Sequence, residues 1–294
     1  MLLALLGSVT FAGKAIIVKL AFRHGVDAVT LIMLRMLFAL PLFAAMAWWA
    51  GRGRPPLGRR DWAGVVWLGA TGYYLASFLD FAGLAYISAS LERLILYLNP
   101  TLVFALGWVL YRRRIARAQA VGMAISYLGV VLVFGLEVHR QGADAAWGAL
   151  LVFASTVSYT FYLVHSGEMV RKLGAIRLVG LATSVACVLC IVQFLLLRPL
   201  SAALEVAAPV VWLSVLNATL CTAAPVVMVM MAVERIGAGP TAQIGMIGPL
   251  VTILLGVLIL GEPLTAWIIA GTVLVVAGIL VFTRGARVAA PPID

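Results

Sequence analysis

Apolar runs of about twenty residues follow one another along almost the whole chain, and this pattern constrains the fold more than any other feature. The hydrocarbon core of a bilayer, roughly 30 Å thick, is crossed by a helix of about 20 apolar residues. Of the 294 residues, 64% are hydrophobic and only 11% are charged, too few to cover a soluble core of this size. The sequence therefore predicts an all-α membrane protein. Ten transmembrane helices are expected, near residues 2–21, 28–50, 62–84, 88–111, 117–136, 146–166, 175–197, 208–232, 238–260 and 265–283.

Lysine and arginine are distributed unevenly between the two sides of these spans. Because basic residues resist translocation, the side that holds more of them faces the cytoplasm. The side shared by both termini has fourteen of the 21: Arg52, Arg54, Arg59, Arg60, Arg112, Arg113, Arg114, Arg117, Arg171, Lys172, Arg177, Arg235, Arg284 and Arg287. The opposite side has four: Arg23, Arg93, Arg140 and Arg198. We therefore expect a multi-pass inner-membrane protein with cytoplasmic termini, and no basic face of the kind that binds nucleic acid.

An internal repeat accounts for the order of the spans. An offset of 149 residues aligns one proline and three glycines without a gap: Pro100 with Pro249, Gly107 with Gly256, Gly122 with Gly271, and Gly129 with Gly278. Each unit holds five spans, an odd number, so the second unit enters the membrane from the side opposite the first. The sequence predicts two inverted-topology five-helix repeats, at 1–137 and 145–284. Such repeats are characteristic of secondary transporters, in which two halves surround a site at the bilayer midplane.

The paired prolines are expected near the centre of the bilayer. A rise of 1.5 Å per residue places Pro100 about 18 Å and Pro249 about 17 Å into their spans. Proline leaves a helix carbonyl without its hydrogen bond, and a free carbonyl does not face lipid. Each proline therefore either marks a hinge beside a cavity or bends a helix at a packed crossing. Its presence in both repeats favours the hinge beside a cavity.

The segments around these prolines resemble the EamA repeats of the drug/metabolite transporter (DMT) superfamily. These segments are YLNP to LYRRR in the fourth span and IGMIGPLVTILLGVLILGEPLT in the ninth. The resemblance covers essentially the whole chain and is greatest to the YddG-type exporters of aromatic and other amino acids. It implies the EamA/DMT fold, with a central cavity lined by spans one, three, four, six and nine. The acidic residue that the family places thirteen residues after the proline is Glu262; Arg113 stands there in the first repeat, so a role for the acid is expected only in the second.

Ionisable residues inside the spans are candidates for the transport pathway, because a charge in hydrocarbon is costly unless it meets water or a partner. Lys14 lies about 18 Å into the first span. It either binds a substrate carboxylate or forms a structural pair with a carboxylate or a free carbonyl. Asp80 lies at roughly the depth of Lys19, so a Lys19–Asp80 ion pair is the first expectation. The alternatives are that Asp80 binds a substrate amino group or carries a coupling proton.

Polar and aromatic residues of the same spans complete the candidate site. Tyrosine in a membrane helix more often serves packing or the interface, but these residues lie on the spans that the family uses to line its cavity. The proposed substrate-binding residues are Lys14, Tyr73, Tyr74, Ser77, Asp80, Tyr97, Asn99, Tyr159, Tyr162 and Gln243, and the hinge residues are Pro100 and Pro249.

The sequence is best explained by an alternating-access secondary transporter that exports small metabolites, with aromatic and neutral amino acids as the first choice. Transport of other metabolites or of drugs, including uptake, is an alternative. An intramembrane lipid-modifying enzyme is a weaker one, because the three histidines are scattered and no catalytic motif accompanies them. No metal or cofactor is expected. The expected partners are a small-molecule substrate and the lipid bilayer; the oligomeric state is left open, and a monomer is compatible with the sequence.

Overall fold

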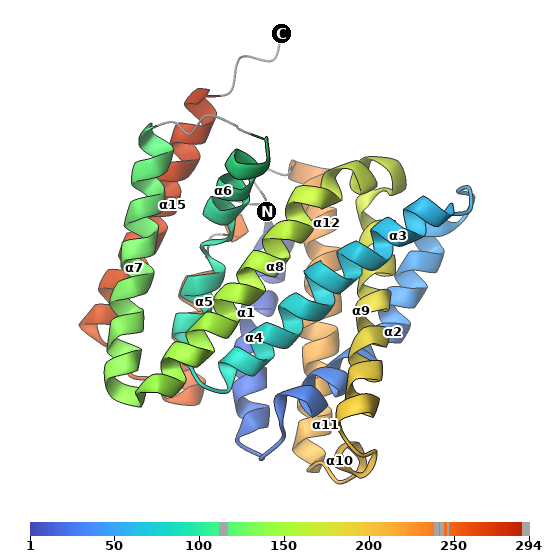
Figure 1. The fold of residues 1–294 in the computed structure, drawn as a ribbon, viewed down its shortest axis with the longest axis horizontal. Coiled ribbons are helices and arrows are strands. Elements are labelled where there is room, and N and C mark those ends of the chain that lie inside the picture. The colour runs from blue at the N-terminus through green and yellow to red at the C-terminus, as the bar shows by residue number, and fades with distance from the viewer. Residues whose placement is uncertain (112–116, 238–240, 242–243, 246, 290–294) are drawn as a thin grey trace.

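The chain folds into a bundle of helices in the computed structural model, which describes residues 1–111, 117–237, 241, 244–245 and 247–289 (Figure 1). Apolar side chains and the scarcity of helix breakers inside the runs explain why the spans form helices. The α-helices are α1 (Leu2–Phe22), α2 (Ala28–Gly51), α3 (Arg59–Leu68), α4 (Ala76–Leu84), α5 (Ala89–Leu96), α6 (Asn99–Tyr111), α7 (Arg117–Gln141), α8 (Ala143–Leu173), α9 (Ala175–Leu197), α10 (Ser201–Leu204), α11 (Ala208–Ala218), α12 (Ala224–Ile236), α14 (Gly248–Leu255) and α15 (Ala266–Ala289). Three π-helical segments are η1 (Gly69–Leu75), η2 (Thr219–Ala223) and η3 (Gly256–Leu260).

Eight of the described helical stretches are long and apolar enough to cross a membrane. This identifies a multi-pass membrane protein. The spans expected near 62–84 and 238–260 are not among the eight. The first corresponds to α3, η1 and α4 in succession, and the second includes a shorter apolar stretch, Gly248–Leu260. The total of ten spans therefore stays a prediction.

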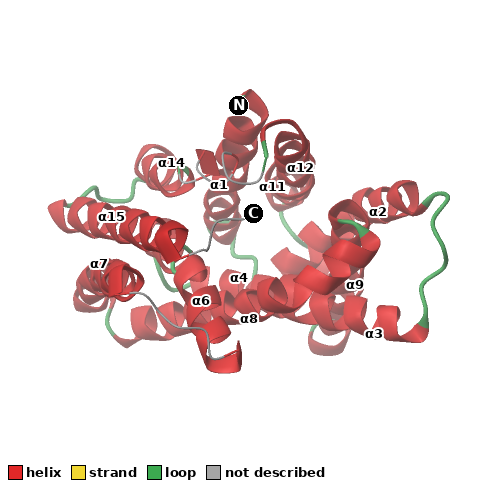
Figure 2. Cartoon of the chain, turned by 90° about the horizontal axis from the view of Figure 1, so that it is seen from above, coloured by secondary structure: helices red, strands yellow, loops and turns green. Residues whose placement is uncertain are grey.

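Helices of the two halves pack against each other in matching pairs. Figure 2 shows α7 and α15 at one end of the molecule, α2, α3 and α9 at the other, and α1, α4, α8 and α12 between them. The most extensive contacts join α7 to α15, α2 to α9, α4 to α8, and α1 to α12. The 149-residue offset relates α7 to α15, α2 to α9, α4 to α12, and α8 to α1. Replacing both helices of a pair by their equivalents gives the α7–α15 and α2–α9 pairs again and turns the α4–α8 pair into the α1–α12 pair.

The repeated glycines lie where α7 and α15 cross. A Cβ atom on Gly122 would lie 2.6 Å from the carbonyl oxygen of Gly278, and one on Gly278 would lie 2.6 Å from that of Gly122. Gly129 and Gly271 are related in the same way, at 2.6 and 2.7 Å. Only glycine permits this approach of two backbones. The contact is reciprocal and antiparallel.

Two of the π segments also occupy equivalent positions. Adding 149 to the bounds of η1 gives 218–224, which encloses η2. A π turn inside an α-helix is rare overall, and those that occur are frequently found at functional sites. The cavity described below lies beside both segments.

Both prolines begin a helix segment rather than bend a continuous one. The chain breaks after α5, and Pro100 is the second residue of α6; Pro249 is the second residue of α14. Proline is well tolerated there, because the first turn of a helix needs no amide donor from it. Among the described residues that line cavities are Asn99 and Gly248, which precede the prolines.

Candidate functional site

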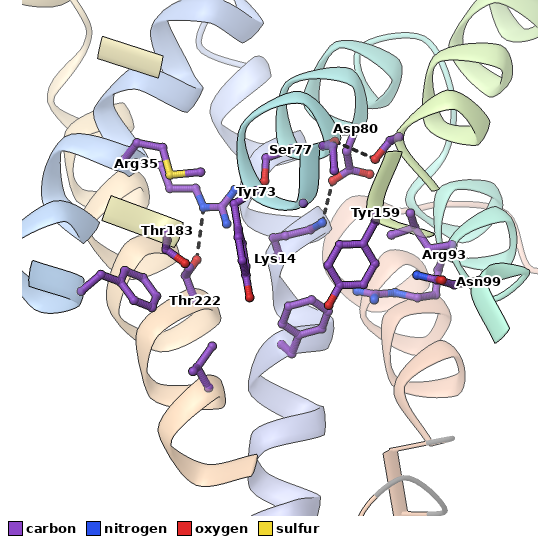
Figure 3. A pocket seen from close by; sticks show the side chains of 18 of the residues that line it. Lys14, Arg35, Tyr73, Ser77, Asp80, Arg93, Asn99, Tyr159, Thr183 and Thr222 are labelled. Atoms are coloured by element: carbon purple, nitrogen blue, oxygen red, sulfur yellow. Dashed lines mark hydrogen bonds and ion pairs between the residues drawn. The ribbon is translucent and has the colours of Figure 1, made fainter. Parts of the chain in front are cut away.

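A cavity of about 340 Å³ lies in the middle of the bundle (Figure 3). Helices α1, α2, α4, α5, α6, α8, α9 and α12 contribute to its wall, together with η1 and η2. A volume of this size is at the small end of ligand-binding pockets and suits a small metabolite. Seven of the residues predicted from the sequence line it: Lys14, Tyr73, Ser77, Asp80, Tyr97, Asn99 and Tyr159.

The remaining predicted residues lie elsewhere. Tyr162 lines an adjoining cavity and contacts Tyr73. Tyr74 packs against the apolar core that includes residues of α2 and α9. Gln243 lies outside the described residues.

Lys14 pairs with Asp80, and the expected Lys19–Asp80 pair is wrong. Lys14 Nζ donates a hydrogen bond of 2.6 Å to Asp80 Oδ2, and both side chains are almost fully buried. Lys19 instead donates to two backbone carbonyl oxygens, those of Leu84 at 3.2 Å and Ile87 at 2.9 Å. Because Lys14 Nζ donates a hydrogen bond to Asp80, the ammonium group of Lys14 has a partner within the protein.

Arg93 is a cavity residue, although the sequence placed it on the outer side opposite the termini. Its residue exposure is 3%, because α5 turns this side chain inward beside Phe11 and α1. The guanidinium donates a long hydrogen bond of 3.5 Å to the carbonyl oxygen of Ala12, and its carbon lies 5.5 Å from the centre of the Phe11 ring. Its Nε is buried and has no hydrogen-bond partner among the described residues. Arg93 therefore keeps an unused hydrogen-bond donor in the cavity wall.

Arg35 is a second buried guanidinium in the wall, contributed by α2. Its Nε donates to Thr222 Oγ1 of η2 at 3.1 Å, and its carbon lies 5.0 Å from the centre of the Phe81 ring. Its Nη1 has no hydrogen-bond partner among the described residues. The cavity wall thus contains two arginines, which lie on opposite sides of the Lys14–Asp80 pair (Figure 3).

Tyrosine side chains lie in and next to the cavity wall. Tyr73 of η1 and Tyr162 of α8 meet edge to face, with ring centres 5.0 Å apart and their hydroxyl oxygens 3.1 Å apart. Tyr159 stacks on Tyr162 at 5.4 Å. The hydroxyl of Tyr97 donates to the carbonyl oxygen of Gly245 at 2.8 Å and so joins the break after α5 to the second half of the chain. Aromatic faces with hydroxyl edges suit a flat apolar group that carries polar ends.

A second cavity, of about 530 Å³, continues from the first toward the side on which α1 begins. The two share Phe11, Tyr73, Arg93, Tyr97, Tyr159 and Val226. The second is also lined by Gly7 and Ser8 of α1, by Ser166 and Val170 near the end of α8, and by Ala175 at the start of α9. The central cavity therefore opens toward the side of the termini.

Polar contacts close the opposite side. The carboxylate of Glu262, which follows η3, accepts hydrogen bonds from the backbone amides of Ala89 and Ser90 at 2.7 and 3.2 Å, and from Ser90 Oγ at 2.7 Å. It thus satisfies amides at the N-terminus of α5. Arg23 donates to the carbonyl oxygen of Leu260 at 2.5 Å. Glu262, from the second half of the chain, therefore holds the outer end of a first-half helix.

Glu92 is the ionisable residue that the sequence reasoning missed. It is fully buried and lies next to Lys14 and Arg93 rather than at the membrane surface. Its place in SLERL gave little signal, because Glu92 lies near the end of its predicted span, where a charged side chain ordinarily reaches the membrane surface. Among the described residues, no group of three His, Cys, Asp or Glu side chains is arranged to hold a metal ion.

The fold and the cavity define a multi-pass membrane protein with a central, one-sided cavity for a small solute. The model of the EamA-like transporter family matches residues 1–135 and 146–284. The chain belongs to this family.

Known proteins agree with this membership. The uncharacterized transporter YcbK of Bacillus subtilis is 31% identical over 277 residues, which cover 88% of this chain and 85% of the relative. An uncharacterized transporter of Archaeoglobus fulgidus is 27% identical, with 94% and 96% covered. A protein of known crystal structure is 19% identical and has a TM-score of 0.64 over 98% of each chain, which shows the shared fold alone.

Proposed function

We propose that the chain is an alternating-access secondary transporter, built from ten spans in two inverted five-helix repeats at 1–137 and 145–284. Three observations support the repeat: the matching helix pairs, the reciprocal glycine contact between α7 and α15, and the equivalent positions of η1 and η2. Two related halves that surround one central site are the arrangement that rocking transporters use. Because one chain supplies both halves, the proposed transporting unit is a monomer.

The proposed orientation places both termini in the cytoplasm of an inner-membrane protein. The excess of basic residues on that side supports it, and removing the buried Arg93 from the opposite side increases the asymmetry. In this orientation the cavity opens to the cytoplasm, and Glu262 closes the periplasmic side. The structure then corresponds to a state ready to accept a cytoplasmic solute, as an exporter requires.

The proposed substrate is a neutral amino acid with an apolar or aromatic side chain. One observation carries this choice: two arginines with unused hydrogen-bond donors, a carboxylate and three tyrosine rings line the same cavity. Arg93 is assigned to the substrate carboxylate, because guanidinium groups bind carboxylates well. Asp80, Ser77 and Asn99 are assigned to the ammonium group. Lys14 is assigned a positioning role, since it holds Asp80.

Binding to the purified protein tests this assignment. We would compare phenylalanine with its decarboxylated amine and its deaminated acid, using thermal unfolding in detergent as the readout. Only the intact amino acid should stabilise the protein, because each analogue leaves one of the two charged subsites without a partner. Equal stabilisation by the amine would remove Arg93 from the site. Stabilisation by none of a panel of amino acids would contradict the proposed substrate class.

A further inference from the structure

Two buried carboxyl groups, Asp80 of α4 and Glu92 of α5, lie against one ammonium group, and several of their oxygens are unused. Lys14 Nζ is 2.6 Å from Asp80 Oδ2 but 3.7 Å from Glu92 Oε1. Arg93 Nε is 3.9 Å from Glu92 Oε2. Neither of the longer distances is a hydrogen bond. In the part of the chain that the structure describes, Asp80 Oδ1 and both oxygens of Glu92 are buried without a hydrogen-bond partner.

The charged groups around this pair come from four helices. Lys14 faces it from α1, Arg35 from α2 and Arg93 from α5, while Asp80 and Glu92 face each other from α4 and α5. Arg35 and Arg93 direct hydrogen bonds to Thr222 and to a backbone carbonyl. Among the described residues, only Lys14 hydrogen-bonds to the pair, and its hydrogen bond goes to Asp80 alone. Glu92 lies near charged groups but forms no hydrogen bond with them.

A buried carboxylate that accepts no hydrogen bond is strongly unfavourable. One added proton removes the problem, because oxygens of Asp80 and Glu92 lie 2.6 and 3.7 Å from the same Lys14 Nζ, and a protonated carboxyl group can donate a hydrogen bond to the other. The shared proton would satisfy Asp80 Oδ1 and an oxygen of Glu92 together, and would leave one negative charge beside Lys14. We propose that Asp80 and Glu92 form a binding site for one proton, which competes with the ammonium group of the substrate for Asp80.

The competition follows from where the two acids lie, and it rests on the proposed function. Asp80 lines the cavity beside Ser77 (Figure 3), whereas Glu92 is fully buried. An ammonium group that enters the cavity takes Asp80 Oδ1 as its acceptor, and Glu92 gives up its proton through Asp80 to water in the cavity. When a proton returns, the ammonium group loses its acceptor and leaves. One proton and one substrate therefore cross in opposite directions, and proton entry drives export.

Proton binding is tested first without substrate, by infrared spectroscopy of the purified protein during a pH titration. The carbonyl stretch of a buried protonated carboxyl group should be present in the wild type and lost in both Glu92→Gln and Asp80→Asn. Glu205→Gln, the same change at an exposed loop residue, is the matched control and should keep the band. A band that survives in Glu92→Gln and Asp80→Asn, or no band in the wild type, would overturn the proton site whether or not any amino acid is transported.

Coupling is tested next with substrate. Binding of phenylalanine in weakly buffered detergent should release up to one proton per molecule bound, and its apparent Kd should rise as the pH falls, by up to about tenfold per pH unit. In Glu92→Gln the release should disappear and the Kd should no longer depend on pH. Binding without proton release in the wild type, or proton uptake, would overturn the competition while leaving the transporter proposal intact. Absence of binding at every pH would instead contradict the proposed substrate, and the infrared titration would still decide the proton site.

Discussion

Gly72, in η1, leaves just enough room for the ring of Tyr162, so a single added methyl group has a predictable effect. A Cβ atom at position 72 would lie 2.4 Å from Cγ, 2.5 Å from Cδ2 and 2.7 Å from Cβ of Tyr162. Carbon atoms in contact lie about 3.5–4.0 Å apart, so the ring or η1 must move by about 1 Å. Overpacking of this kind costs about 1–3 kcal/mol. Since the Tyr162 hydroxyl contacts that of Tyr73, the movement also disturbs a cavity side chain.

Thermal unfolding in detergent and phenylalanine affinity measure both effects for Gly72→Ala. The matched control is Gly135→Ala in α7, because a Cβ atom there meets nothing within 4 Å. Gly135→Ala should keep wild-type affinity and be slightly more stable, by about 0.5–1 kcal/mol, as expected for alanine in a helix. Gly72→Ala should be less stable and bind more weakly. If the two variants behave alike, the close packing of Tyr162 on η1 is not what shapes this wall.

Two further predictions concern polar contacts at the side opposite the termini. Glu262→Gln removes the negative charge that accepts hydrogen bonds from the amides of Ala89 and Ser90, and a hydrogen bond to a charged group is worth about 1.5–3 kcal/mol. In the Glu262→Gln background, Ser88→Cys should therefore react roughly tenfold or more faster with a membrane-impermeant maleimide added on that side. Unchanged labelling would mean that Glu262 does not hold the closed state. Asp27 caps α2, and Asp27→Ala should lower the free energy of unfolding by about 0.5–2 kcal/mol. Partial burial acts to raise the pKa of Asp27, but hydrogen bonds from Thr30 and nearby groups outweigh it and hold the pKa below the ordinary value of 3.8. Its stabilising contribution is therefore present above pH 3.8 and lost as the pH falls further, so the difference between wild type and Asp27→Ala should shrink in acid.

The sequence predicted best where glycine or proline fixed the geometry. The register that aligns Gly122 with Gly271 and Gly129 with Gly278 marked the glycines that meet where α7 and α15 cross, although it did not predict which helices pair. It also marked Pro100 and Pro249, where the structure begins new helix segments inside spans that the sequence treated as continuous. These constraints are local, so they do not depend on how the helices tilt.

Depth arithmetic failed for Asp80 because it assumed upright helices. Figure 1 shows α4 and α8 running obliquely across the bundle, so equal numbers of residues do not mean equal depth. Lys14 and Lys19 also point in directions about 140° apart around α1, since each residue turns a helix by about 100°. Depth alone therefore predicted Lys19 as the partner of Asp80, whereas the rotation of α1 and the tilt of α4 bring Lys14 to Asp80.

The burial of Glu92 and Arg93 could not be read from the order of residues. Both lie near the end of their predicted span, where a charged side chain ordinarily reaches the membrane surface. The break after α5 and the packing of α5 against α1 and α14 keep them inside instead. That arrangement depends on the second half of the chain, and no local pattern around Glu92 encodes it.

Counterflow in proteoliposomes tests the central claim, that the cavity containing Arg93 is the transport site. Liposomes loaded with unlabelled phenylalanine should take up radiolabelled phenylalanine transiently when they contain the wild-type protein. Arg93→Gln should abolish this exchange, while Arg171→Gln, a change at an exposed arginine, should leave it at the wild-type rate. Exchange at the wild-type rate by a folded Arg93→Gln protein would contradict the account.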